Sequence, residues 1–284
     1  MHDVSRVKEG IVRFWPRETL VDKVLGIIRI AREVGLPAGV ASKLYGVSNF
    51  IETGMFGRIG RAGLWAIKDR QKETVFELTP PISLSFELLS DLFKLRPQRE
   101  YLLWNSTMRR AITASDAAYE GGRGSAGFLS VIDPGKPEET RLGKVIRLPQ
   151  RLYTLWEARI TYIAQLELLA VLVALTEVAG LVRGTSSIWF IDNIAALMAL
   201  VKGSSGSHSL DQMAQMVHLA CFAIRSVPYF EYVESKANWS DEISREGVQG
   251  TWAPNNAFSV GECGVVVDLL TLPSIAVVKT FEYL

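Results

Sequence analysis

Four carboxylates stand at positions where an acidic side chain is chemically conspicuous. Asp116 lies in a short strand-like run, and Glu167 lies in the middle of an apolar helical run. Asp192 directly follows an apolar strand-like run, and Asp241 stands at a predicted helix start. Carboxylate oxygens are the ligands that Mg²⁺ prefers, and carboxylates held close together repel one another until a cation binds. The four side chains would therefore suit a divalent metal site if the fold brings them together.

Each carboxylate also has an ordinary structural alternative. Burial of a glutamate is costly, but Glu167 could extend to water at the edge of its helix. Asp192 or its neighbour Asn193 could cap the helix that follows. Ser240 or Asp241 could start the last helix in the same way. For each residue taken alone, the sequence leaves these alternatives open.

The elements that would carry these residues alternate between strand-like and helix-like patterns. Gly121, Gly122 and Gly124 favour a tight hairpin turn after the first strand, because a phosphate-binding loop would need a following Lys-Ser/Thr and a helix. The alternation predicts an α/β domain. In order, we predict three strands, a helix, a strand, two helices, a strand and a helix start, at residues 109–119, 125–132, 140–148, 160–179, 187–191, 194–201, 210–225, 229–233 and 240 onward.

The first hundred residues have a helical pattern and a different charge. Residues 1–110 contain 18 Lys and Arg against 12 Asp and Glu, whereas the remainder contains 13 against 18. This difference in charge fits a phosphate-binding domain beside a domain that carries acidic residues. It equally fits an ordinary variation of charge between two domains. The basic stretch 58–72 is likewise either a solvated helix face or a nucleic-acid contact. Apolar residues recur at helical spacing in four segments, at residues 18–33, 37–50, 59–69 and 83–95.

We predict three parts in the chain. These are a basic helical domain at 1–105, an α/β domain at 106–250, and a tail at 251–284 whose role the sequence does not indicate. With 48% hydrophobic and 21% charged residues, the 284-residue chain is typical of a globular protein and not of a disordered one. Its two cysteines give no disulfide framework.

No signal-peptide pattern or clean membrane span is evident. The apolar run 160–182 contains two glutamates, and the run 264–284 contains a proline and several charges. We expect an intracellular protein, in the cytoplasm or nucleus, without a membrane partner.

The ordered set of acids resembles the ribonuclease H fold, in which four such carboxylates meet at one end of a mixed sheet. The runs Ile163–Leu169 and Phe190–Asn193, and the spacing Asn238-x-x-Asp241-x-x-Ser244-Arg245, are similar to ribonuclease H domains of retroelement reverse transcriptases. This resemblance covers about residues 109–247. Residues 37–70 more weakly resemble the thumb and connection that precede that domain.

The resemblance implies a fold and an activity. The fold would be a mixed five-stranded sheet flanked by helices, preceded by a smaller, mainly helical domain. Asp116, Glu167, Asp192 and Asp241 would be both the catalytic residues and the ligands of two Mg²⁺ ions, with Mn²⁺ as a substitute. Asp116 and Asp192 would be the ligands shared between the two ions. The chain would hydrolyse the RNA strand of RNA–DNA hybrids, which such enzymes recognise largely by shape.

Five further residues would contact the substrate: Arg123, Asn193, Lys236, Asn238 and Arg245. Two features depart from the family pattern. The loop 234–237 has no histidine, which many members carry there and which is thought to help product release, so turnover would either be slower or be helped by Lys236. No paired-aspartate motif of a polymerase palm is present. We therefore expect the downstream part of a reverse transcriptase, with the polymerase part as a partner and no polymerase activity of its own.

Two other functions remain open at this level. A catalytically decayed retroelement remnant would bind nucleic acid or a protein without cutting. A chain with the same fold but a different substrate would cut DNA, as resolvases and integrases do. The presence of all four acids argues against the first of these.

Overall fold

The computed structural model describes residues 2–52, 54–95, 98–103, 108–156, 158, 160–264, 270 and 272–284. The chain divides into two compact units, Met1–Ser106 and Thr107–Leu284, which are treated separately below. The domain boundary predicted between residues 105 and 106 lies outside the described residues.

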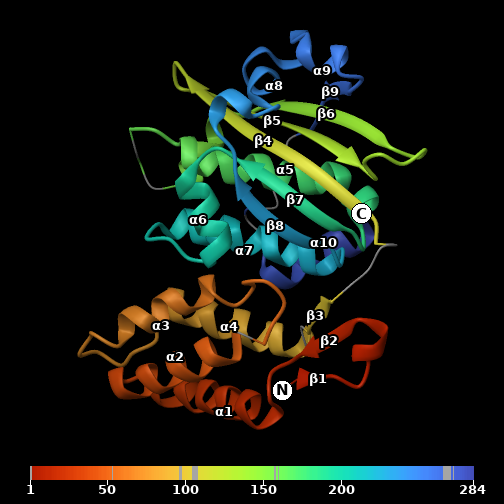
Figure 1. The fold of residues 1–284 in the computed structure, drawn as a ribbon. Coiled ribbons are helices and arrows are strands. Elements are labelled where there is room, and N and C mark those ends of the chain that lie inside the picture. Colours follow the sequence, from red (N-terminus) through yellow and green to blue (C-terminus); the bar gives the residue numbers. More distant parts are fainter. Residues whose placement is uncertain are drawn as a thin grey trace. The chain divides into compact units, whose positions relative to one another are not determined.

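The first unit combines helices with a small antiparallel sheet (Figure 1). Its elements are β1 (His2–Asp3), β2 (Ile11–Phe14), α1 (Glu18–Val34), α2 (Ala38–Glu52), α3 (Trp65–Arg70), α4 (Pro80–Leu95) and β3 (Arg99–Leu102), with short 3-10 turns at Val7–Glu9 and Ala62–Leu64. Strand β2 pairs with both β1 and β3. Helix α1 ends before Gly35, whose φ of 88° is a left-handed conformation that glycine adopts without strain. Helices α1, α2 and α4 follow the predicted segments, whereas the predicted helix 59–69 is α-helical only from Trp65 onward. The three short strands were not predicted.

The basic stretch of the first unit is partly turned inward. Arg70 is fully buried, and its guanidinium donates to the carbonyl oxygens of Val75 and Glu77, each at 2.7 Å. Its Nε also forms an ion pair with Glu73 at 3.0 Å. This arginine therefore holds the loop after α3 in place. It belongs neither to a solvated helix face nor to a surface that could contact nucleic acid, the two alternatives for residues 58–72. Lys68 and Lys72 are exposed.

The second unit is built on one mixed sheet with the strand order β8-β7-β4-β5-β6-β9 (Figure 1). Strands β4, β5 and β6 are antiparallel neighbours, whereas β7 runs parallel to both β4 and β8. The predicted fold class, a mixed sheet flanked by helices, is confirmed. The sheet has a sixth strand, β9, which lies parallel to β6. The strands are β4 (Arg110–Glu120), β5 (Arg123–Ile132), β6 (Thr140–Arg147), β7 (Ser186–Ile191), β8 (Val227–Tyr232) and β9 (Ser259–Glu262).

Helices cover both faces of this sheet. On β5, a Cβ at Gly124 would meet Leu166 of α5, whereas a Cβ at Gly127 would meet Ile243 and Ser244 of α8. Positions 124 and 127 differ by an odd number, so they face opposite sides of the sheet, and α5 and α8 lie on opposite faces. The helical elements are α5 (Ile163–Val182), α6 (Ile194–Lys202), α7 (His208–Ala223), α8 (Asp241–Glu246), α9 (Trp252–Asn255) and α10 (Ser274–Tyr283), with 3-10 turns at Gln150–Leu155, Ser235–Ala237 and Gly247–Gln249.

Helix α5 forms the centre of the core. By length and composition it could cross a membrane, but 78% of its apolar window is buried inside the protein. It packs against β4 and β5 on one side and α7 on the other. Its apolar character is therefore explained by burial between a sheet and a helix.

The segment after Gly250 is integrated into the second unit. It supplies α9, the edge strand β9, and α10, which packs against α7 with Val277, Val278 and Phe281 buried. Arg183 fixes the end of α10 by donating to the carbonyl oxygen of Phe281 at 3.0 Å. These contacts assign a structural role to residues for which the sequence indicated none.

Candidate active site

Two parallel neighbouring strands bring Asp116 and Asp192 together. Strands β4 and β7 pair in parallel register up to Ser115 and Ile191, and each aspartate is the next residue along its chain. The two side chains therefore leave adjacent strands at the same level of the sheet. Asp116 is buried, with 2% of its surface exposed, and Asp192 is half-buried.

Glu167 reaches the same place from helix α5. Its Oε1 accepts a hydrogen bond from the backbone N–H of Ala117, the residue after Asp116, at 3.3 Å. Only 2% of Glu167 is exposed, so its side chain does not extend to water at the helix edge. Its Oε2 is buried and has no hydrogen-bond partner within the described residues.

The three carboxylates form a compact cluster. One oxygen each from Asp116, Glu167 and Asp192 lies within 4.8 Å of the others. An arrangement of three oxygens at such spacing could hold a metal ion. A buried carboxylate oxygen without a donor is costly, and a cation bound at the cluster would remove that cost.

The capping alternative applies to Asn193 and not to Asp192. The Oδ1 atom of Asn193 accepts a hydrogen bond from the N–H of Ala196 at 3.0 Å, as an N-cap of α6 does. Asp192 is thereby left to face Asp116 and Glu167. The side-chain oxygen of Asn193, a proposed substrate contact, is occupied by this cap.

Asp241 stands apart from the compact cluster. It is the first residue of α8, and its Oδ1 accepts a hydrogen bond from Nε of Arg245 at 3.0 Å. Arg245 also donates to Glu120 at the end of β4 at 3.3 Å. Asp241 is near enough for its charge to raise the pKa of Asp116, but it is not one of the three cluster members.

Two side chains, one from the loop before α8 and one from α8 itself, hold Asp116 in place. Ser244 Oγ donates to Oδ2 of Asp116, and Asn238 Nδ2 donates to Oδ1 at 3.5 Å and to the carbonyl oxygen of Ser115 at 3.2 Å. The Oδ1 atom of Asn238 accepts from Ser240 Oγ at 2.7 Å. Asn238 was expected to contact substrate; its amide here positions a carboxylate instead.

Gly127 allows Ser244 to reach Asp116. It is the residue opposite Asp116 on β5, and a Cβ there would lie 3.0 Å from the backbone nitrogen of Ser244. Helix α8 therefore rests directly on the backbone of β5. No role was predicted from the sequence for Ser244 or Gly127. The only sequence feature that could have indicated a role for Ser244 was its spacing after Asp241 in the run Asn238-x-x-Asp241-x-x-Ser244-Arg245.

Burial and mutual repulsion shift the pKa values of the cluster. Burial raises the pKa of Asp116 to about 7, opposed by the hydrogen bond from Ser244 and assisted by the charges of Asp192 and Asp241. Burial also raises the pKa of Glu167 well above its usual value, with the charges of Asp116 and Asp192 acting in the same direction. Carboxylates held in this way bind protons or cations strongly.

The remaining two predicted substrate contacts are exposed, one at the start of a strand and one in a 3-10 turn. Arg123 opens β5 directly after the turn at Gly121 and Gly122, whose φ values of 56° and 77° require the flexibility of glycine. Lys236 lies in the 3-10 turn before Asn238. Both side chains are exposed.

The comparisons with known proteins found structural neighbours only. No protein-family model and no curated protein matches the sequence. Ribonuclease H1 from the halophilic archaeon Halobacterium salinarum NRC-1 is 16% identical, with a TM-score of 0.35, over 49% of this chain and 98% of that protein. The N-terminal ribonuclease H domain of Rv2228c from Mycobacterium tuberculosis, solved as a fusion with maltose-binding protein, is 14% identical, with a TM-score of 0.35, over 49% and 94%. LC9-RNase H1, a type 1 enzyme with the type 2 active-site motif, is 16% identical, with a TM-score of 0.34, over 51% and 71%.

We predict that Ser244→Ala raises the pKa of Asp116 further. The substitution removes a donor to the carboxylate, and a hydrogen bond to a charged group contributes about 1.5–3 kcal/mol, equivalent to about one or two pKa units. The ¹³C carboxyl shift of Asp116, followed against pH in metal-free protein, measures this directly. Ser235→Ala, at an exposed position, is the matched control. An unchanged pKa in Ser244→Ala would show that the contact does not stabilise the charged form.

Proposed function

We propose that the second unit is a metal-dependent endonuclease that hydrolyses the RNA strand of RNA–DNA hybrids. The observation that carries this proposal is the cluster of Asp116, Glu167 and Asp192, in which one buried oxygen of Glu167 has no donor among the residues that the structure describes. A cluster that serves only structure would be expected to pair its buried oxygens with donors from the protein.

The residues present fit Mg²⁺. All three cluster members offer carboxylate oxygens, and their repulsion and raised pKa values are relieved by a cation. Asp116, Glu167 and Asp192 would hold the metal, with Asp241 at the edge of the site completing a second position. Bound Mg²⁺ ions would activate a water molecule and stabilise the leaving oxygen of the phosphodiester.

The chain's own residues prepare this chemistry. Ser244 and Asn238 fix the orientation of the Asp116 carboxylate, so its oxygens need not reorganise when a cation binds. The N–H of Ala117 does the same for Glu167. Arg245 holds Asp241 at the rim and balances part of the negative charge.

The choice of hybrid as substrate rests on the resemblance of the acid-bearing motifs to retroelement ribonuclease H domains. On the same ground, we infer that the chain is the downstream part of a reverse transcriptase, with its first unit in the place of the thumb and connection. Two exposed basic residues of the second unit are the candidates for phosphate contact: Arg123 at the start of β5 and Lys236 in the 3-10 turn before Asn238.

A substrate panel tests the proposal. The full chain is incubated with labelled RNA–DNA hybrid, duplex RNA and duplex DNA of one sequence, with Mg²⁺ or with a chelator. We expect Mg²⁺-dependent cleavage of the RNA strand in the hybrid and no cleavage of either pure duplex. Preferential cutting of duplex DNA would indicate a resolvase-type or integrase-type substrate. A chain inert with both Mg²⁺ and Mn²⁺ would indicate a decayed remnant.

A further inference from the structure

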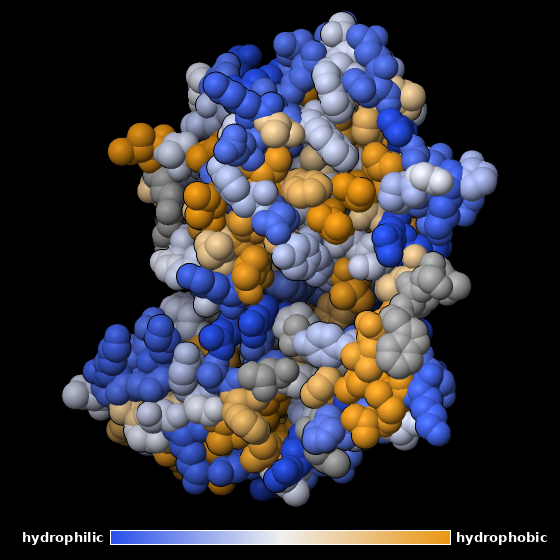
Figure 2. All heavy atoms as spheres, viewed as in Figure 1, coloured by the Kyte–Doolittle hydropathy of each residue, from blue (hydrophilic) through white to orange (hydrophobic). Residues whose placement is uncertain are grey.

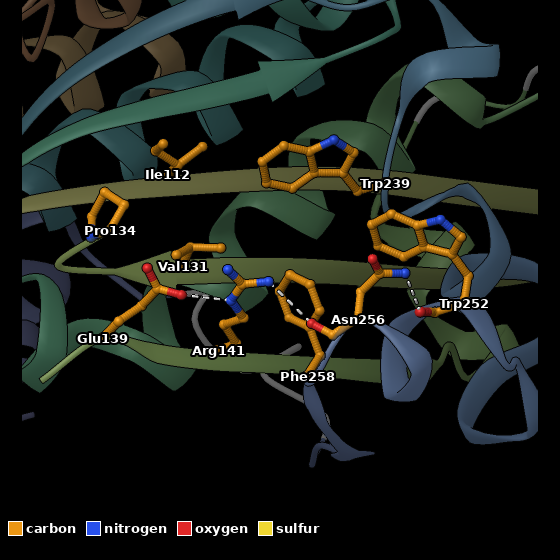
Figure 3. A pocket seen from close by; sticks show the side chains of 9 residues that line it. All are labelled: Ile112, Val131, Pro134, Glu139, Arg141, Trp239, Trp252, Asn256 and Phe258. Atoms are coloured by element: carbon orange, nitrogen blue, oxygen red, sulfur yellow. Dashed lines mark hydrogen bonds and ion pairs between the residues drawn. The ribbon is translucent and has the colours of Figure 1, made fainter. Parts of the chain in front are cut away.

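A pocket of about 400 Å³ opens on the second unit away from the acid cluster (Figure 3). Its floor includes Ile112 of β4 and Val131 of β5, which are paired across the two strands. Ile112 and Asp116 lie four residues apart on β4, so they face the same side of the sheet. At about 3.3 Å per residue, the pocket lies roughly 13 Å along β4 from Asp116.

This face of the sheet is less covered than the face beneath α5. Ile112 is in register with Ile188 of β7, which in turn is in register with Tyr229 of β8. Ile188 and Tyr229 are 37% and 61% exposed. Figure 2 shows apolar side chains gathered on the near face of the second unit. The pocket therefore continues into an open surface that a long ligand can cross.

Two indole rings form one end of the pocket. Figure 3 shows Trp239 and Trp252 next to each other, with Pro134 and Glu139 at the opposite end. Trp252 is 39% exposed, so part of its ring is accessible for stacking. Trp239 directly follows Asn238, which donates to Asp116. The pocket and the acid cluster are thus connected by a single loop.

The charged groups of the pocket neutralise one another. Arg141 Nε donates to Oε1 of Glu139 at 2.6 Å, and the guanidinium lies 5.9 Å from the ring centre of Phe258. Arg141 Nη1 also donates to the carbonyl oxygen of Asn256 at 3.1 Å. One paired cation and one paired anion leave no net charge, which disfavours phosphate or a metal ion as the occupant. A neutral planar ring with a polar edge suits this combination of apolar floor, indole faces and fixed polar groups.

We propose that the pocket binds an unpaired nucleobase of the nucleic acid held at the acid cluster. The substrate class would then be a hybrid that carries a single-stranded extension. Every base has a face that can stack on an indole, so this site would act on single strands without strong sequence preference. The distance of about 13 Å corresponds to about four nucleotide steps of 3.4 Å in a stacked strand. This inference rests on the proposed function, because it needs nucleic acid at the acids.

Fluorescence anisotropy with the full chain in a chelator tests this inference without cleavage. The probes are a blunt hybrid and the same hybrid with four unpaired nucleotides on either strand. We expect the wild-type chain to bind at least one extended hybrid about tenfold more tightly than the blunt one. Trp252→Ala should abolish this preference and leave blunt-hybrid binding and Mg²⁺-dependent cleavage unchanged. Trp252→Phe, which keeps a stacking ring, should retain most of it, and Tyr283→Ala, at a 91% exposed aromatic residue of α10, is the matched control.

The outcomes separate this inference from the proposed function. Equal binding of blunt and extended hybrids by the wild-type chain, or an undiminished preference in Trp252→Ala, would overturn the pocket assignment even if the hybrid is cut. If no hybrid is cut but a single-stranded oligonucleotide binds in a Trp252-dependent manner, the pocket assignment stands and the proposed activity fails. Thermal melting of each variant shows whether the fold is intact. If Trp252→Ala is unfolded, Trp252→Leu, which keeps apolar bulk but has no aromatic face, carries the test and should lose the preference.

Discussion

Asp192→Asn is expected to reduce hybrid cleavage by at least about 10³-fold. The substitution removes a negative charge from a cluster whose three carboxylate oxygens lie within 4.8 Å of one another. Metal-ion catalysis supplies several kcal/mol of transition-state stabilisation, and each 1.36 kcal/mol corresponds to about a tenfold change in rate. Initial rates on a labelled hybrid at saturating Mg²⁺ measure the effect, and anisotropy with the same hybrid shows whether binding survives.

The matched control for this variant is Glu138→Gln. It removes one negative charge from an exposed position of the second unit and should leave the rate within about twofold of the wild-type value. Asn193 caps α6 and is unchanged in Asp192→Asn, so the helix start should remain intact. Cleavage by Asp192→Asn at the wild-type rate would exclude Asp192 from the metal site.

Asp116→Asn is expected to stabilise the metal-free chain above pH 7 while it abolishes cleavage. In the folded protein the pKa of Asp116 is raised from 3.8 to about 7, chiefly by burial. Between these two values the folded state binds more protons than the unfolded state, so wild-type stability falls as pH rises through that window. At 1.36 kcal/mol per pKa unit, the loss is about 4 kcal/mol at pH 8.

The asparagine variant avoids this loss because it has no proton to release. Its amide can accept from Asn238 and donate to Ser244 Oγ, which can then donate to the carbonyl oxygen of Asp241. Urea unfolding at pH 4 and pH 8 in a chelator measures the difference: the two chains should be similar at pH 4, and the variant should be more stable at pH 8. The same pH dependence in both chains would contradict the assignment of a protonated, buried Asp116.

Mg²⁺ should reverse this order of stability. A ligand that binds only the folded state stabilises it by mass action, so added Mg²⁺ should stabilise the wild-type chain at pH 8 and have little effect on Asp116→Asn. Asp192→Asn and Asp116→Asn together therefore separate the contribution of the acids to folding stability from their contribution to catalysis.

The parts of the fold that depend on local pattern could be predicted from the sequence. The apolar pattern of α5 and the alternation of strand-like and helix-like runs predicted the order of these elements along the chain. Glu167 was conspicuous because its helical neighbours are apolar, and it is buried at the cluster. The first carboxylate, Asp116, was placed correctly in a strand, and its parallel neighbour supplies Asp192.

Other features depend on contacts between distant residues and gave little local signal. Strand β9 has four residues and pairs with β6 over a separation of more than a hundred positions, so its pattern is too short to indicate a strand. Ser244 reaches Asp116 only because Gly127 lets α8 approach the sheet. Asp241 pairs with Arg245 and therefore lies at the rim of the site. This pairing depends on the side-chain rotamers, which the spacing of residues in the sequence does not determine.

The central claim is that Asp116, Glu167 and Asp192 form one divalent metal centre. Titration of the metal-free chain with Mn²⁺ at pH 8, with the free ion followed by electron paramagnetic resonance, tests it most directly. We expect saturable binding by the wild-type chain and by Glu138→Gln, and at least about tenfold weaker binding by Asp116→Asn, Glu167→Gln and Asp192→Asn. Equal Mn²⁺ binding by all five chains, or no binding by the wild-type chain, would contradict it.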